Sequence, residues 1–107
     1  MIQQQNSKTN PYLTQKVLTA SPEQLIAYVY DFGAVACKQK NSIKARNAVQ
    51  TLMNALNFEA KDAKKISETF FNVYRHLNFL INNQKFSQAG DIFSELKVSW
   101  SNAFGVH

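Results

Sequence analysis

The sequence predicts an all-α protein, an antiparallel up-down-up-down four-helix bundle with an N-terminal arm. Hydrophobic residues make up 45% of the 107 residues, enough for one packed core. The 3 glycines and 2 prolines are too few for the frequent turns of a β-sandwich. Apolar residues recur at helical spacing in four segments, with short connections near 40–42, 57–60 and 82–86. Such short connections make successive helices antiparallel neighbours.

Residues 1–20 are expected to form a flexible N-terminal arm, and residues 21–107 the helical bundle domain. The first ten residues are almost all polar, which is typical of a mobile segment. Tyr12, Val17 and Leu18 are apolar and need a surface to rest on. The arm lacks the pattern of a secretory signal, and no stretch of about 18 apolar residues follows it. We therefore expect a cytoplasmic protein without a membrane span.

The first helix is predicted to begin sharply after Ser21. Ser21 is the N-cap, Pro22 the first helical residue, and Gln24 closes a capping box. Two adjacent apolar stripes follow, which predict that this is the most buried helix: Leu25, Val29, Phe32 and Ala36, and beside them Ile26, Tyr30, Gly33 and Cys37.

The second helix is predicted after Asn41 and Ser42, with Asn57 as its stop. Its apolar residues give the clearest helical period of the sequence: Ala45, Ala48, Val49, Leu52, Met53 and Leu56. The third helix is expected from about Ala60 to Asn82, with an inward face of Ala63, Ile66, Phe70, Val73, Tyr74, Leu77, Leu80 and Ile81. The fourth is expected from about Phe86 to Ala103, with an inward face of Ala89, Ile92, Phe93, Leu96, Trp100 and Ala103.

The sequence contains no motif for catalysis, for phosphate binding or for a metal. Asp91 and Glu95 lie one helical turn apart, but a solvated helix face explains them better than a metal site does. His76 lacks the lysine and glycine that follow the histidine in phosphotransfer domains. The lone Cys37 is interpreted as a small buried hydrophobe. We therefore expect no enzyme, no cofactor and no metal.

The net charge of +5 raises the question of a nucleic-acid partner. One basic cluster lies at the connection between the first two predicted helices and consists of Lys38, Lys40, Lys44 and Arg46. A second lies at the start of the third predicted helix and consists of Lys61, Lys64 and Lys65. In an up-down bundle these clusters lie at opposite ends, whereas duplex binding needs one continuous basic stripe. We expect only weak, nonspecific binding to DNA.

Several aromatic residues fall off the predicted core faces. Phe71 lies at the edge of the third helix's core face, and Phe79 lies near its opposite side. Tyr28 and Phe32 widen the apolar face of the first helix, and Phe104 follows the end of the fourth. Together they favour an exposed apolar groove that holds an amphipathic helix or an extended segment of a partner.

The opening of the chain resembles the signature of the FliS-type flagellar secretion chaperones. The matching residues are Asn10–Tyr12 and the ten residues Val17–Ile26, continued by Tyr30-Asp31; Leu96–Trp100 is similar to the end of that family. The resemblance covers essentially the whole chain. It implies a cytoplasmic export chaperone that binds the disordered C-terminal segment of flagellin, prevents premature polymerisation and keeps flagellin competent for secretion. It also implies contacts with export-gate components.

The groove and the resemblance together predict the partner-binding residues Tyr12, Val17, Leu18, Ile26, Tyr30, Phe71, Tyr74, Phe79 and Trp100. Two alternatives stay open at this point. One is a helical adaptor for another secreted or regulatory client. The other is a weakly basic nucleic-acid-binding bundle.

Overall fold

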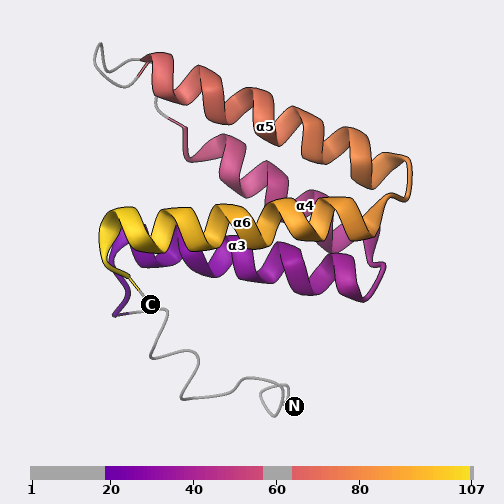
Figure 1. The fold of residues 1–107 in the computed structure, drawn as a ribbon, viewed down its shortest axis with the longest axis horizontal. Coiled ribbons are helices and arrows are strands. Elements are labelled where there is room, and N and C mark those ends of the chain that lie inside the picture. The colour runs from indigo at the N-terminus through magenta and orange to yellow at the C-terminus, as the bar shows by residue number, and fades with distance from the viewer. Residues whose placement is uncertain (1–18, 57–63, 107) are drawn as a thin grey trace, which may run out of the picture.

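The computed structural model describes residues 19–56 and 64–106, and within these ranges the chain is helical and contains no strand. The four helices are α3 (Pro22–Lys38), α4 (Ser42–Asn54), α5 (Lys64–Asn82) and α6 (Phe86–Phe104), as Figure 1 shows. The all-α prediction is thereby confirmed. The structure ends the second helix at Asn54, earlier than predicted, and the predicted start of the third at Ala60 lies outside the described residues.

The start of α3 confirms the predicted capping box. The Gln24 backbone N–H donates to Ser21 Oγ at 3.1 Å, and the Ser21 N–H donates to Gln24 Oε1 at 2.8 Å. Two N–H groups that a helix start leaves without partners are thus satisfied within one turn. Asn41 caps α4 with a single bond, in which its Oδ1 accepts from the Lys44 N–H at 3.0 Å.

The turns after α3 and α5 each contain a residue in the left-handed region that glycine normally occupies. Lys40 has φ 55° and Gln84 has φ 59°. In each turn the next N–H donates back to the helix, from Asn41 to the Ala36 carbonyl and from Lys85 to the Leu80 carbonyl, both at 2.8 Å. These bonds satisfy the last carbonyls and reverse the chain sharply.

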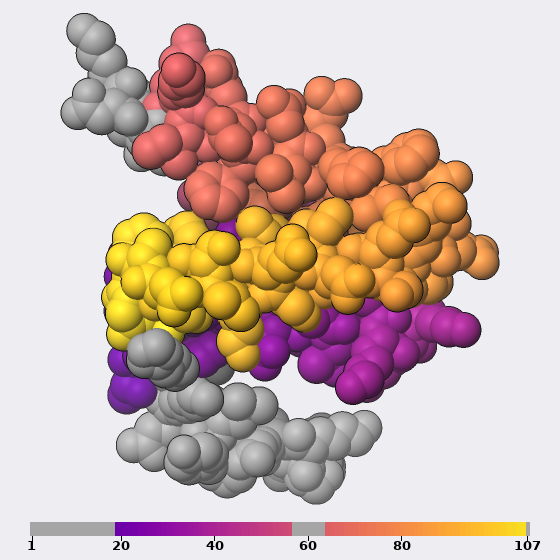
Figure 2. All heavy atoms as spheres, in the orientation of Figure 1, coloured from indigo at the N-terminus to yellow at the C-terminus, as the bar shows by residue number. Residues whose placement is uncertain are grey.

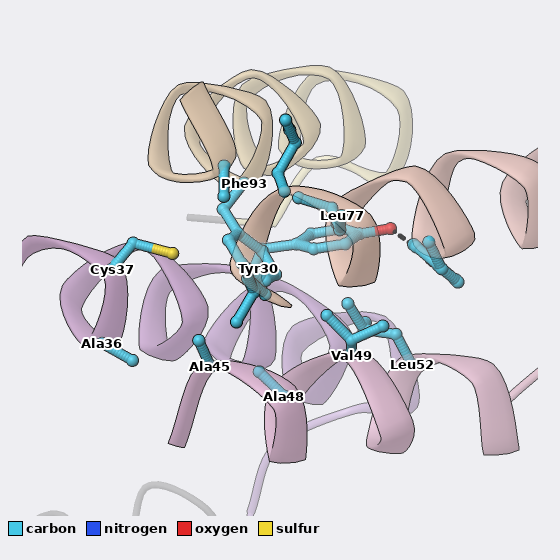
Figure 3. Packing of buried hydrophobic residues seen from close by; sticks show 13 residues of the cluster. Tyr30, Ala36, Cys37, Ala45, Ala48, Val49, Leu52, Leu77 and Phe93 are labelled. Carbon is cyan, nitrogen blue, oxygen red and sulfur yellow. Dashed lines mark hydrogen bonds between the residues drawn. The ribbon is translucent and has the colours of Figure 1, made fainter. Parts of the chain in front are cut away.

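The core lies where α3 packs between α4 and α6, with α5 closing the other side. Figure 3 shows Tyr30 at its centre, surrounded by side chains of the neighbouring helices. The periodic face of α4 is buried through Ala45, Ala48, Val49 and Leu52, as its spacing predicts. Cys37 is also buried, and burial raises the pKa of its thiol, consistent with the interpretation as a core residue.

Gly33 allows α3 and α6 to approach closely. A Cβ at this position would lie 2.5 Å from Phe93 Cε1, and Phe93 is fully buried. The ring therefore occupies the space that any side chain at position 33 would need. Gly90 on α6 has more space beside it than Gly33 has, because a Cβ added there would lie 3.4 Å from the Cys37 Cβ.

The prediction that both apolar stripes of α3 are buried is wrong in part. Leu25 and Phe32, both in the predicted stripes, are exposed, whereas Ala27, which is outside the stripes, is buried. The reason is that α3 packs mainly against two helices, α4 and α6, which cover only part of its circumference. Ile66 and Ala103 were likewise expected in the core and are exposed.

Candidate functional site

An apolar groove opens at the end of the bundle where α3 and α5 begin and α4 and α6 end. It has a volume of about 850 Å³ and is lined by Pro22, Glu23, Leu25, Ile26, Val29, Thr51, Leu52, Ala55, Leu56, Ile66, Ser67, Phe70, Tyr74, Leu96, Ser99, Trp100, Ala103 and Phe104. In Figure 2 the first turns of α5 (red) stand away from the last turns of α6 (yellow), and the surface between them is hollowed.

The groove exists because α5 packs tightly over only part of its length. Leu77, Leu80 and Ile81, in its C-terminal half, are buried. In its N-terminal half Ile66 is 60% exposed and Phe70 is only half-buried. The apolar side chains of α5 are therefore less buried toward Lys64 than toward Asn82. The unfilled space beside that half is the groove.

Aromatic rings form the floor and one wall of the groove. Trp100 packs edge-to-face on Tyr30 and on Phe70, with centroid separations of 6.0 and 6.1 Å, and its ring lies 4.4 Å from that of Phe104. Phe70 in turn lies 5.9 Å from Tyr74. Such ring pairs are worth roughly 0.5–1.5 kcal/mol each beyond the area they bury. Helices α3, α5 and α6 thus contribute the rings that form this part of the groove.

The polar atoms of these rings are turned into the protein. Tyr30 and Tyr74 share a hydrogen bond between their hydroxyl groups at 2.8 Å, and Trp100 Nε1 donates to the Glu23 carbonyl at 2.8 Å. Burial raises the pKa of both tyrosines above the ordinary value, so both are neutral at physiological pH. What these rings present to the groove is apolar and uncharged.

Exposed apolar side chains surround the mouth of the groove. Leu25 on α3, Ile66 on α5 and Phe104 on α6 are 38%, 60% and 51% exposed, respectively, and all three line it. A contiguous apolar hollow with an exposed apolar mouth is typical of a site for a partner's apolar segment. Among the described residues that line the groove, Glu23 is the charged one.

The structure brings together some of the predicted partner-binding residues and separates others. Ile26, Tyr74 and Trp100 line the groove. Tyr30 lies beneath it, fully buried, and supports Tyr74 and Trp100. Phe79 is 56% exposed but lies away from the groove, stacked on His76 at 6.2 Å.

Phe71 is half-buried and does not line the groove. Tyr12, Val17 and Leu18 lie outside the described residues, so their predicted role stays a prediction.

Sequence reasoning missed most of the groove's wall. Leu25, Ile66, Phe70 and Leu96 were placed in the core, because apolar residues at helical spacing are ordinarily buried. The signal that could have found them is their position near helix ends. Large apolar residues close to the ends of all four helices must converge once short turns set the helices side by side.

Within the part of the chain that the structure describes, no three His, Cys, Asp or Glu side chains gather as a metal site would require. No helix in the same ranges is long and apolar enough to cross a membrane. No protein-family model, no curated protein and no solved structure matches the chain.

Proposed function

We propose that this chain is an export chaperone whose groove binds the C-terminal segment of flagellin as a helix. Bound in this way, the segment is withheld from polymerisation and flagellin stays competent for secretion in the cytoplasm. The observation that carries the proposal is the apolar groove with its exposed mouth. The resemblance of Val17–Ile26 to the FliS-type chaperones supplies the identity of the client. We also propose that successive helices are antiparallel, so that the fold is an up-down-up-down four-helix bundle.

The physical basis is folding coupled to binding. A disordered segment that becomes helical on the chaperone loses about 2–5 kcal/mol to ordering. Each apolar side chain that it buries fully returns about 1.5–3 kcal/mol. Two or three anchors at positions i, i+3 or i+4, and i+7 of one helix face therefore offset the cost. A groove of about 850 Å³ has room for such a set of side chains.

The aromatic part of the groove selects apolar anchors because its rings carry no charge. Both floor tyrosines are uncharged and their hydroxyl groups are already paired with each other. A charged client side chain placed against these rings would lose its hydration without gaining a partner. We therefore expect a client helix with leucine, valine, isoleucine or phenylalanine on one face, and charged residues only on the face that stays in water.

The direct test is calorimetric titration of the full chain with flagellin and with flagellin lacking its C-terminal segment. Trp100 is the only tryptophan and lines the groove, so its fluorescence gives a second readout. Binding to intact flagellin and loss of binding to the truncated form are expected. If flagellin does not bind but another client's apolar helix does, the chain is an adaptor for that client.

A matched pair of substitutions locates the site. Ile66 and Val98 are both β-branched and both 60% exposed, but only Ile66 lines the groove. Ile66→Asp should weaken client binding at least tenfold, about 1.4 kcal/mol, because it puts a charge where an apolar anchor would rest. Val98→Asp should leave affinity within about twofold. Equal losses in the two variants would place the site elsewhere.

The arm gives a separate prediction, because α3 begins only at Pro22. Deleting residues 1–12 should leave the bundle folded and change the client's affinity. Tighter binding means that the arm competes for the groove, and weaker binding means that Tyr12 contacts the client. Equal affinities in the same titration would remove Tyr12 from the binding residues.

A further inference from the structure

The end of the bundle opposite the groove carries a cluster of exposed cationic side chains, here called the turn end. Its members come from the end of α3, the start of α4 and the residue before α6: Lys38, Lys40, Lys44, Arg46 and Lys85. The chain has a net charge of +5, and this cluster brings five of its positive charges to one end of the bundle.

Two contacts show that these residues share one end. Lys38 and Lys40 line a shallow hollow together with Phe86 and Ser87, so the end of α3 adjoins the start of α6. Arg46 Nη1 donates to Asn82 Oδ1 at 3.3 Å, so the start of α4 adjoins the end of α5. In Figure 1 the α3–α4 and α5–α6 turns accordingly lie at the same end of the molecule.

The charge at the turn end is not neutralised from within. Among residues 19–56 and 64–106, the five cations form no ion pair, and the pair that does form, Lys97 with Asp31 at 3.2 Å, lies along the side of the bundle. Asp91 is the acidic residue that lines the hollow beside Lys38 and Lys40, and it is exposed. A partner with negative charge would meet a net positive surface here.

An exposed apolar side chain lies within this cluster. Ile43, in the first turn of α4, is 66% exposed, the most of any large apolar side chain in the described residues. The α4 residues that face the core lie on the other side of the helix from Ile43. Lys44 follows it directly and Arg46 follows three positions later.

We propose that the turn end binds an anionic phospholipid surface peripherally. Lys40, Lys44 and Arg46 would lie over the headgroups, and Ile43 would enter the boundary with the acyl chains. A bilayer interface offers both environments side by side, whereas a duplex offers phosphates around a groove filled with water and no place for an isoleucine. The client groove, at the other end, would stay open while the protein rests on the membrane.

The test is co-sedimentation of the full chain with vesicles at about 0.1 M salt. One set contains about 30% phosphatidylserine in phosphatidylcholine, and the other contains phosphatidylcholine alone. Each cation near an anionic surface raises the partition coefficient about fivefold. Lys40→Gln/Lys44→Gln should therefore lower partitioning to the anionic vesicles about 25-fold. The matched control Lys64→Gln/Lys65→Gln removes the same charge at the groove end and should change it less than about twofold.

The isoleucine has its own control. Ile43→Ser should lower partitioning about fivefold, and Val98→Ser, at a similarly exposed apolar position, should leave it unchanged. Equal binding to neutral and anionic vesicles, or equal losses in the two lysine double variants, would overturn the proposal. So would binding to duplex DNA that is tighter than binding to the anionic vesicles at the same salt. Circular dichroism melts would confirm that each variant is folded.

Discussion

Two glycine-to-alanine substitutions should move stability in opposite directions, because the space beside them differs. At Gly33 the added Cβ would lie 2.5, 2.6 and 2.7 Å from three carbons of the Phe93 ring. Favourable carbon–carbon contacts lie near 3.5–4.0 Å, so the overlap is about 1 Å. Phe93 is fully buried, so any shift of its ring must displace the core around it. At Gly90 the added Cβ would lie 3.4 Å from Cys37 Cβ, which is ordinary contact.

The magnitudes follow from these distances. Overpacking costs about 1–3 kcal/mol, and three overlapping carbons on an enclosed ring place Gly33→Ala at the upper end. Alanine is favoured over glycine within a helix by up to about 1 kcal/mol. Gly33→Ala should therefore lower the free energy of unfolding by about 2 kcal/mol. Gly90→Ala should raise it by up to about 1 kcal/mol, a difference of about 3 kcal/mol between two identical chemical changes.

Urea unfolding followed by circular dichroism measures both values, and the midpoint temperatures should differ in the same order. The double variant Gly33→Ala/Phe93→Leu tests the cause, since leucine lacks the ring carbons that collide. Its loss should be at least about 1 kcal/mol smaller than the sum of the single losses. The reasoning is refuted if Gly33→Ala is as stable as the parent protein, or if the two losses simply add.

Ser21→Ala should lower the free energy of unfolding by about 1 kcal/mol in the same urea assay, because Ser21 Oγ accepts the Gln24 N–H; coincident unfolding curves would contradict this. Lys40→Gly and Gln84→Gly should each raise it by about 0.5–1 kcal/mol, since both residues occupy the left-handed region, and unchanged thermal midpoints would speak against it. Burial raises the pKa of Tyr30 and Tyr74 above the unfolded value of about 10, so their contribution is complete below about pH 10 and is lost as pH rises above it. Replacing both by phenylalanine should flatten the alkaline fall in stability, and an identical pH profile would count against the buried pair.

Some elements followed directly from the sequence because their signals are local. The capping box at Ser21 depends on residues three positions apart, and the structure contains it as predicted. The face of α4 also came out as its spacing predicts, because its apolar stripe is narrow enough to fit one core. The start of α6 at Phe86 and the end of α5 at Asn82 were likewise predicted from the short polar connection between them.

Local sequence signals could not decide which apolar residues of α3 are buried. Its apolar residues surround more than half of the helix, so periodicity alone left open which of them are covered. The positions of α4 and α6 decided that Tyr30, Ala36 and Cys37 are buried and that Leu25, Phe32 and Val35 are exposed. The close approach at Gly33 was equally hidden, since it depends on a ring of α6 that is distant in sequence.

By itself the sequence predicted that the described chain is helical, where α3 and α6 begin and where α5 ends. It also indicated an excess of aromatic residues over those on the core faces. Only the tertiary structure decided which apolar residues line the groove. Ile66 and Leu77 obey the same helical period on α5, yet Leu77 is fully buried and Ile66 lies at the mouth of the groove. A residue's burial is set by the neighbours that other helices bring to it, and helix neighbours are present along only part of α5.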